Sequence, residues 1–211
     1  MKILSSRIFW GLVLILGGVL FLLQNLGIFQ GGDLFWGICL GVAGLLFLGV
    51  FVGDRQQWWA LIPGIVLLAV GSLILLTSFV PGFNEILGGM VILGGIGLSF
   101  LFVYLANRAN WWALIPGGVM ITLAAVAGLE GVISEGALGG IFFMGFGLTF
   151  AIVGIVPTPS GKMKWAWIPA IILMLLGLLV FFTAENLLVY FLPVALFLAG
   201  GVLIWRAIRS R

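Results

Sequence analysis

The heptapeptide WWALIPG at residues 58–64 returns unchanged at residues 111–117 and, in altered form, as WAWIPA at residues 165–170. The Ile-Pro pair recurs every 53 residues, with its prolines at Pro63, Pro116 and Pro169. A constant period of this length is typical of one supersecondary unit copied in tandem. The copies contain no evident catalytic or ligand-binding set. They therefore indicate the architecture of the protein more than its activity.

The composition is that of a membrane protein. The chain has 211 residues, of which 64% are hydrophobic and 7% are charged, whereas soluble domains carry about 25% charged residues. A helix needs roughly 20 apolar residues to cross a hydrocarbon core of about 30 Å. The chain is long enough for about eight such spans joined by short loops, and no stretch is polar enough to form a separate soluble domain.

The residue types that usually carry chemistry are scarce. Histidine is absent and Cys39 is the one cysteine, which excludes an intrachain disulfide and a Cys-x-x-Cys site and removes the commonest metal ligand, haem ligand and general base. No Asp, Glu, Lys or Arg lies in the central part of any expected span, where such residues usually mark ion paths or proton relays. We therefore expect a non-enzymatic protein with no catalytic residues, no cofactor and no metal site.

Turn signals divide the apolar sequence into eight expected transmembrane helices. Glycine, proline and polar residues cluster between the apolar runs, as in the Val80-Pro81-Gly82 turn. The expected spans are residues 8–26, 34–52, 59–79, 86–105, 112–129, 137–156, 165–182 and 187–205.

The charged residues divide cleanly between the two ends of these spans. All nine basic residues fall on the side that holds both chain termini, where Asp54 is the single acid. The opposite loops contain no base and five acids, which are Asp33, Glu85, Glu130, Glu135 and Glu185. By the positive-inside rule, the basic side and both termini are predicted to be cytoplasmic.

These observations predict an all-α membrane protein with eight transmembrane helices arranged as four tandem helical hairpins. Residues 1–211 are expected to form a single transmembrane domain, with hairpins at residues 7–53, 58–106, 111–157 and 164–206. Because each hairpin contains two spans, successive hairpins share one orientation. They then form parallel repeats with a period of about 53 residues.

Tryptophans recur where the basic loops become spans. Indole rings favour the headgroup region of a bilayer, so the sequence predicts an interfacial belt of Trp58, Trp59, Trp111, Trp112, Trp165 and Trp167. Stacking walls for a pigment, quinone or lipid headgroup are the alternative, but no polar group accompanies the rings to fix a ligand. Each proline of the motif is expected in or just after the first turn of its helix, where the missing N–H costs little.

Small residues recur four positions apart near the start of three of these helices. This spacing places both residues on one helix face and lets a neighbouring backbone approach closely, which favours helix association in lipid. The predicted helix-packing residues are Ala60, Gly64, Ala113, Gly117, Ala166, Ala170, Gly37 and Gly41. Packing within one chain and packing between chains have the same signature, so both stay open.

Four hydroxyl side chains lie deep in the expected spans, namely Ser72, Ser99, Thr122 and Thr149. Each is alone on its helix and can donate to the carbonyl four residues earlier. Convergence of these hydroxyls on one axis would favour a transport path. Scatter would favour a scaffold.

The opening run RIFWGLVLILGGVLFLLQNLG, residues 7–27, has an Arg-x-x-Trp-Gly start and a Leu-x-Asn-x-Gly finish. It resembles the LiaI/LiaF-like bacterial transmembrane region, mainly over residues 7–57, and the later hairpins resemble it more weakly. The resemblance implies a membrane anchor or regulator linked to cell-envelope stress sensing, which contacts a partner such as a sensor kinase. It brings no catalytic residues with it.

Together these features predict a multi-pass protein of the bacterial plasma (inner) membrane that acts as a scaffold, regulator or accessory subunit through helix–helix contacts. The expected partners are membrane lipids and either another membrane protein or a second copy of the chain, and no nucleic acid. The alternative is a transporter or channel for a neutral or lipidic substrate, with its path along the axis that relates the repeats.

Overall fold

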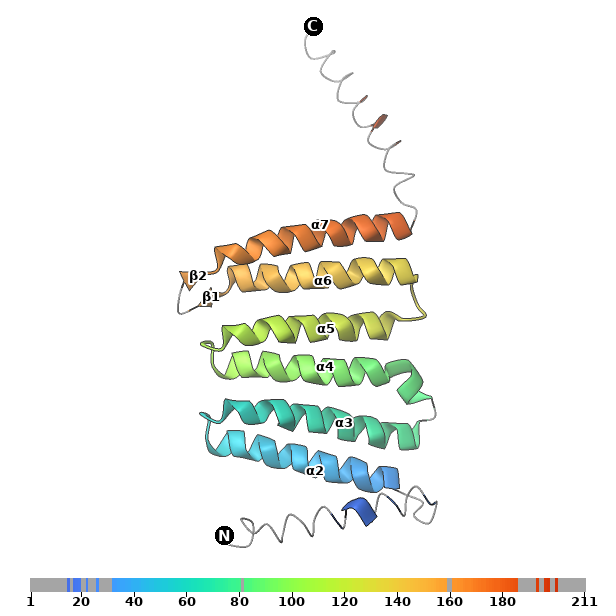
Figure 1. Ribbon diagram of the computed structural model, residues 1–211, viewed down its shortest axis with the longest axis vertical. Helices are drawn as coiled ribbons and strands as arrows, with labels where there is room; N and C mark the ends of the chain where they lie inside the picture. The colour runs from blue at the N-terminus through green and yellow to red at the C-terminus, as the bar shows by residue number, and fades with distance from the viewer. Residues whose placement is uncertain are drawn as a thin grey trace.

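The computed structural model describes residues 32–80, 82–158 and 161–185, together with isolated positions nearer the two ends of the chain. In these ranges six long helices follow one another (Figure 1). They are α2 Gly32–Gly53, α3 Leu61–Phe79, α4 Phe83–Ala106, α5 Leu114–Leu129, α6 Glu135–Ile155 and α7 Trp167–Ala184. With the short turns that precede some of them, all six are long and apolar enough to cross a membrane. The chain thus has the makeup of a multi-pass membrane protein.

The six helices correspond to the six spans predicted between residues 34 and 182, and each end agrees to within three residues. The all-α class and six helices able to span a membrane are therefore confirmed for the described residues. The first and eighth predicted spans lie outside the described residues. The total of eight spans and the cytoplasmic position of both termini stay predictions.

All three copies of the tryptophan motif fold in the same way. Each begins with a 3₁₀ turn that leads directly into an α-helix, and the turns are η1 Trp58–Ala60, η2 Trp111–Ala113 and η3 Lys164–Ala166. The N–H of Ala60 donates to the carbonyl of Gln57 at 3.0 Å, and the alanines of the other two turns make the equivalent bond. Pro63 is the third residue of α3. It lies in the first turn as predicted, where its missing N–H removes no intrahelical bond.

The loops before the first two motifs also form the same kind of turn. Asp54 Oδ1 accepts a hydrogen bond from the N–H of Gln56, and Asn107 Oδ1 accepts one from the N–H of Ala109, both at 2.9 Å. Such side-chain turns reverse the chain in few residues. The third loop is longer and forms a small antiparallel hairpin of β1 Pro157–Thr158 and β2 Gly161–Lys162.

The helices lie side by side in a row, and each packs on its neighbours in the chain (Figure 1). The most extensive packing joins α2 to α3, α4 to α5 and α6 to α7, which are the pairs connected by the tryptophan loops. The expected hairpins at residues 58–106 and 111–157 group α3 with α4 and α5 with α6 instead. Those helices are also adjacent, but they share less contact. A pair centred on a tryptophan loop is therefore the tighter unit.

One buried cluster links the pairs at the tryptophan end of the row. At its centre Ala60, Ala113 and Ala166 have no exposed surface. Around them lie Phe51, Leu61, Val103, Tyr104, Leu114 and Val153. Burial along the helices is low, since between 17% and 28% of each apolar span is buried. The described helices form an open row that leaves much of its apolar surface exposed.

Candidate interaction surfaces

Glycines bring the two helices of each tight pair to backbone distance. A Cβ added to Gly44 on α2 would lie 2.8 Å from the carbonyl oxygen of Gly64 on α3. In the next pair, a Cβ on Gly117 would lie 3.3 Å from the carbonyl oxygen of Gly97. These distances leave little or no room for a side chain. The helices therefore associate by close backbone packing, which is a main source of helix affinity in lipid.

In the first and third pairs, a second crossing lies seven residues from the first. A Cβ on Gly37 would lie 3.2 Å from the carbonyl oxygen of Gly71. The α6–α7 pair repeats this arrangement at Gly140–Gly177 and Gly147–Ala170, where the corresponding Cβ-to-oxygen distances are 2.9 and 3.0 Å. A seven-residue spacing returns to nearly the same helix face after two turns, as in coiled coils.

The structure places most of the predicted packing residues at these contacts. Gly37, Gly64, Gly117 and Ala170 lie at helix crossings, and the three motif alanines lie in the buried cluster. Gly41 contributes only its backbone to a crossing, since a Cβ added to Gly71 would lie 2.9 Å from the backbone N of Gly41, whereas a Cβ added to Gly41 itself would meet nothing within 4 Å. Gly97, which continues the small-residue pattern on the fourth expected span, also lies at a crossing, but sequence reasoning missed the partner glycines Gly44, Gly71, Gly140, Gly147 and Gly177. The seven-residue spacing, rather than the four-residue one, was the signal that could have found them.

One layer of the third pair carries its large side chain on the other helix from the first two pairs. In the first two pairs the first helix contributes Phe51 or Tyr104 to the buried cluster, and the second contributes Leu61 or Leu114. In the third pair the first helix carries Gly154, and a Cβ there would lie 2.9 Å from Nε1 of Trp167 on the second. The large residue has changed helix, so the layer stays filled.

The predicted belt tryptophans all lie at the end of the row where the tight pairs are joined. Trp59, Trp112 and Trp165 each meet a phenylalanine of the preceding helix edge-on, with ring centroids 6.1 to 6.2 Å apart. Trp58 also meets Trp112 at 5.8 Å, which connects the first pair to the second. Most of these indoles are also substantially exposed. Their location is compatible with an interfacial belt, which stays a prediction.

Charged residues separate along the helices. Arg55, Arg108, Lys162 and Lys164 lie at the tryptophan end. The guanidinium of Arg55 stacks over Phe51 at 4.7 Å, and that of Arg108 over Tyr104 at 4.5 Å.

The opposite end is acidic. There Ser134 caps α6 by accepting the N–H of Ala137 at 3.2 Å, and its hydroxyl donates to Glu185 at 2.6 Å. These bonds tie the start of α6 to the end of α7.

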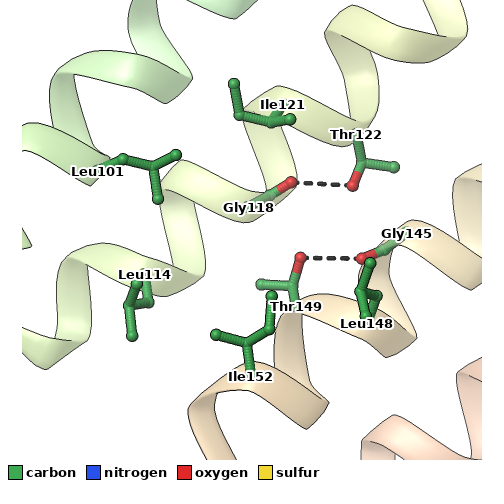
Figure 2. Close-up of a pocket in the computed structure, with 9 residues that line it drawn as sticks. All are labelled: Leu101, Leu114, Gly118, Ile121, Thr122, Gly145, Leu148, Thr149 and Ile152. Atoms are coloured by element: carbon green, nitrogen blue, oxygen red, sulfur yellow. Dashed lines mark hydrogen bonds between the residues drawn. The ribbon is translucent and has the colours of Figure 1, made fainter. Parts of the chain in front are cut away.

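The seam between α5 and α6 contains a pair of threonines over a pair of glycines. Thr122 Oγ1 donates to the carbonyl of Gly118, and Thr149 Oγ1 donates to that of Gly145, both at 2.9 Å (Figure 2). Each glycine lies under the threonine of the other helix, so a Cβ on either glycine would overlap that threonine. A cavity of about 170 Å³ opens beside them, walled by Leu101, Leu114, Ile121, Leu148 and Ile152.

This cavity continues along the seam into a second one. The second has a volume of about 350 Å³, shares Ile121, Thr122, Gly145 and Leu148 with the first, and reaches Met174 on α7. The two form one groove, here called the α5–α6 groove. A further cavity of about 340 Å³, here called the α3–α4 cavity, is lined mainly by α2 and α3, with Leu48, Leu61 and Ile65 among its residues, and it reaches Phe102 on α4. Leu48, Leu61 and Ile65 lie 53 positions before Leu101, Leu114 and Gly118.

The four deep hydroxyls all donate within their own helices, as predicted. Ser72 and Ser99 use the carbonyl three residues earlier, at 2.8 and 2.6 Å, whereas the two threonines use the one four residues earlier. Thr122 and Thr149 converge on the α5–α6 groove. Ser99 is fully buried elsewhere on α4 and Ser72 is exposed on α3, so the set does not define one axis.

Exposed apolar ridges border these seams. The α4 ridge consists of Leu98, Phe102 and Leu105, and the α6 ridge of Leu148, Ile152 and Ile155. The two sets are spaced identically along their helices, 50 positions apart. Triplets of the same spacing are also exposed on the two outer described helices, at Ile38, Val42 and Leu45 on α2 and at Ile168, Ile172 and Leu175 on α7. The α4 and α6 ridges are the pair on the inner helices of the row.

In the described ranges, no three His, Cys, Asp or Glu side chains gather where they could hold a metal ion. The chain matches no family model, no curated protein and no solved structure. Its function has to be argued from the ridges, the groove and the two charged ends of the row.

Proposed function

We propose that this chain is a non-enzymatic integral membrane protein that acts as a scaffold, regulator or accessory subunit by packing its helices against those of a partner. The observation that carries this proposal is the repeated pair of exposed ridges on α4 and α6. Each ridge exposes three large apolar side chains, by between 42% and 61% of their surface. The partner is another membrane protein or a second copy of the chain.

The ridges suit helix docking because their residues lie three and four positions apart. Rows of this spacing form the ridges that fit the grooves of a neighbouring helix. In lipid, such fit matters more than apolarity, because acyl chains are as apolar as leucine. A row that presents the same ridge twice can hold two equivalent helices at a fixed separation, which is the task of a scaffold.

A bacterial inner-membrane location and an envelope-stress role are parts of the same proposal. They rest on the resemblance of residues 7–57 to the LiaI/LiaF-like region and on the clean division of charge between the loops.

Transport of a neutral or lipidic substrate remains the second candidate. The convergence of Thr122 and Thr149 on one groove favours it. Against it, both hydroxyl hydrogens are already used by backbone carbonyls, and Ser72 and Ser99 lie elsewhere. A lateral groove of this kind is better suited to holding a molecule than to passing one across the membrane.

Mild-detergent extraction from native membranes, followed by mass spectrometry, tests the scaffold proposal. The double variant Phe102→Ala/Ile152→Ala removes one large side chain from each ridge, and both residues are exposed, so the fold should survive. A matched control, Leu76→Ala/Ile92→Ala, trims exposed apolar residues outside the ridges. Stoichiometric association in the wild type and the control, weakened at least tenfold in the ridge variant, supports the proposal. A monomer without protein partners in all three samples refutes it.

A further inference from the structure

The α5–α6 groove has the length of one membrane leaflet. Its lining on α5 runs from Leu114 at the tryptophan end to Ala125. At a rise of about 1.5 Å per residue, these 11 steps cover roughly 16 Å, which is about half of a 30 Å hydrocarbon core. The lining on α6, from Ile152 to Ile141, runs antiparallel over the same depth. The groove therefore spans the depth of one acyl chain entering from the tryptophan side.

The groove ends between two basic loops. The loop that leads into α5 contains Arg108, and the loop that follows α6 contains Lys162 and Lys164. All three side chains are exposed, and neither loop contains an acidic residue. A lipid chain lying in the groove would bring its headgroup between these three positive charges.

We propose that the α5–α6 groove binds an anionic phospholipid, with one acyl chain along Gly118, Thr122, Gly145 and Leu148 and with its phosphate near Arg108, Lys162 and Lys164. The apolar walls accept the chain, and the cations select the headgroup by charge. This site depends on the chain lying in a bilayer and needs no protein partner, but it shares Leu148 and Ile152 with the α6 ridge, so a helix docked on that ridge would compete with the lipid.

The neighbouring α3–α4 cavity is a poorer site for the same lipid. Ile65 occupies the position that Gly118 holds in the α5–α6 groove, so a branched side chain stands where the groove has a glycine. One of its two bordering loops contains Asp54 beside Arg55, which cancels a positive charge. The α3–α4 cavity therefore serves as an internal control for the selectivity of the α5–α6 groove for anionic phospholipid.

The test uses the full-length protein in phosphatidylcholine nanodiscs that contain a small fraction of a lipid probe with a photoreactive acyl chain. The probe is either phosphatidylglycerol or phosphatidylcholine, and labelled peptides are identified by mass spectrometry. We expect phosphatidylglycerol to label α5 and α6 at least fivefold more than phosphatidylcholine does, because one basic residue near the surface favours anionic lipid by about that factor. The α3–α4 peptides should show a smaller preference.

Two variants separate the chain site from the headgroup site. Ala125→Phe places a ring in the groove at an exposed position and should remove most α5–α6 labelling. The control Ser72→Phe adds the same ring at the exposed position 53 residues earlier, on α3, and should leave that labelling unchanged. Lys162→Gln/Lys164→Gln should lower the preference for phosphatidylglycerol at least fivefold. Equal labelling by both lipids in the wild type, or unchanged labelling in Ala125→Phe and in the lysine variant, overturns the proposal. Should Ala125→Phe fail to fold, the lysine variant alone decides.

Discussion

Gly44→Ala should destabilise the protein, and Gly41→Ala, one turn away on the same helix, should not. A Cβ at position 44 would lie 2.8 Å from the carbonyl oxygen of Gly64 and 3.0 Å from the backbone N of Leu68, whereas one at position 41 would meet nothing within 4 Å. Ordinary contact for a Cβ begins at 3.4 Å. The side-chain Cγ of Leu68 would also lie at 2.9 Å, but because the other two obstacles are backbone atoms, the two helices would have to separate by about 0.6 Å near this crossing.

The magnitude follows from two opposing terms. Overpacking of this kind costs about 1–3 kcal/mol, and replacing glycine by alanine inside a helix returns about 0.5–1 kcal/mol. We expect Gly44→Ala to lose about 1–2 kcal/mol, while Gly41→Ala keeps only the gain. Gly37→Ala should lie between them, because its closest obstacles are side-chain atoms of Leu75, which can rotate away more easily than backbone can.

The assay is unfolding in mixed micelles with rising mole fraction of a denaturing detergent, followed by tryptophan fluorescence and circular dichroism. The expected order of stability is Gly41→Ala, then Gly37→Ala, then Gly44→Ala, with the extremes separated by at least a factor of ten in the folding equilibrium, or about 1.4 kcal/mol. Equal stability of Gly41→Ala and Gly44→Ala would refute the assignment of these crossings to close backbone packing.

Three further predictions test other contacts. Gly154→Phe alone should lower the stability by about 1–3 kcal/mol through overpacking against Trp167. The added change Trp167→Leu should restore part of this stability, because it gives the third pair the same residues as Phe51 and Leu61 in the first. If the second change restores nothing, the exchanged layer is wrong. Ser134→Ala removes a helix cap and the bond to Glu185, so it should cost about 1 kcal/mol and speed hydrogen exchange at the start of α6, whereas exchange unchanged there would count against the cap. Single cysteines at Arg108 and Glu130, in a Cys39→Ala background, should react with an impermeant maleimide from inside and outside the cell respectively, and reaction of both from one side would rule out this arrangement of spans.

The sequence was sufficient to predict the six described helices because apolar length and turn residues specify each span locally. The close approach at Gly64 and Gly117 was also predictable, since the repeat places both in equivalent positions. The partners were not, because a four-residue spacing in one motif says nothing about which residue of the preceding helix lies opposite. Gly41 shows the limit most clearly, as its spacing from Gly37 fits a packing face while its Cβ direction is open.

The α5–α6 groove could not be predicted for a related reason. It depends on Gly118, which breaks the repeat where the earlier copy has Ile65. In the sequence alone, such a difference is indistinguishable from neutral drift. The facing of Thr122 and Thr149 likewise depends on the register between two helices, which short-range patterns do not encode.

The row has a consequence for how the protein is made. Each tight pair comprises helices that are consecutive in the chain and joined by a short loop, and among the described helices its extensive packing is with the neighbouring pair. Such sequence-local contacts form early and quickly, and arrays of this type assemble unit by unit. During synthesis, α2 and α3 can complete their glycine crossings as soon as both have entered the bilayer, while the ribosome is still translating α6. The growing protein then never needs to hold more than a few unpaired helices in the membrane at once.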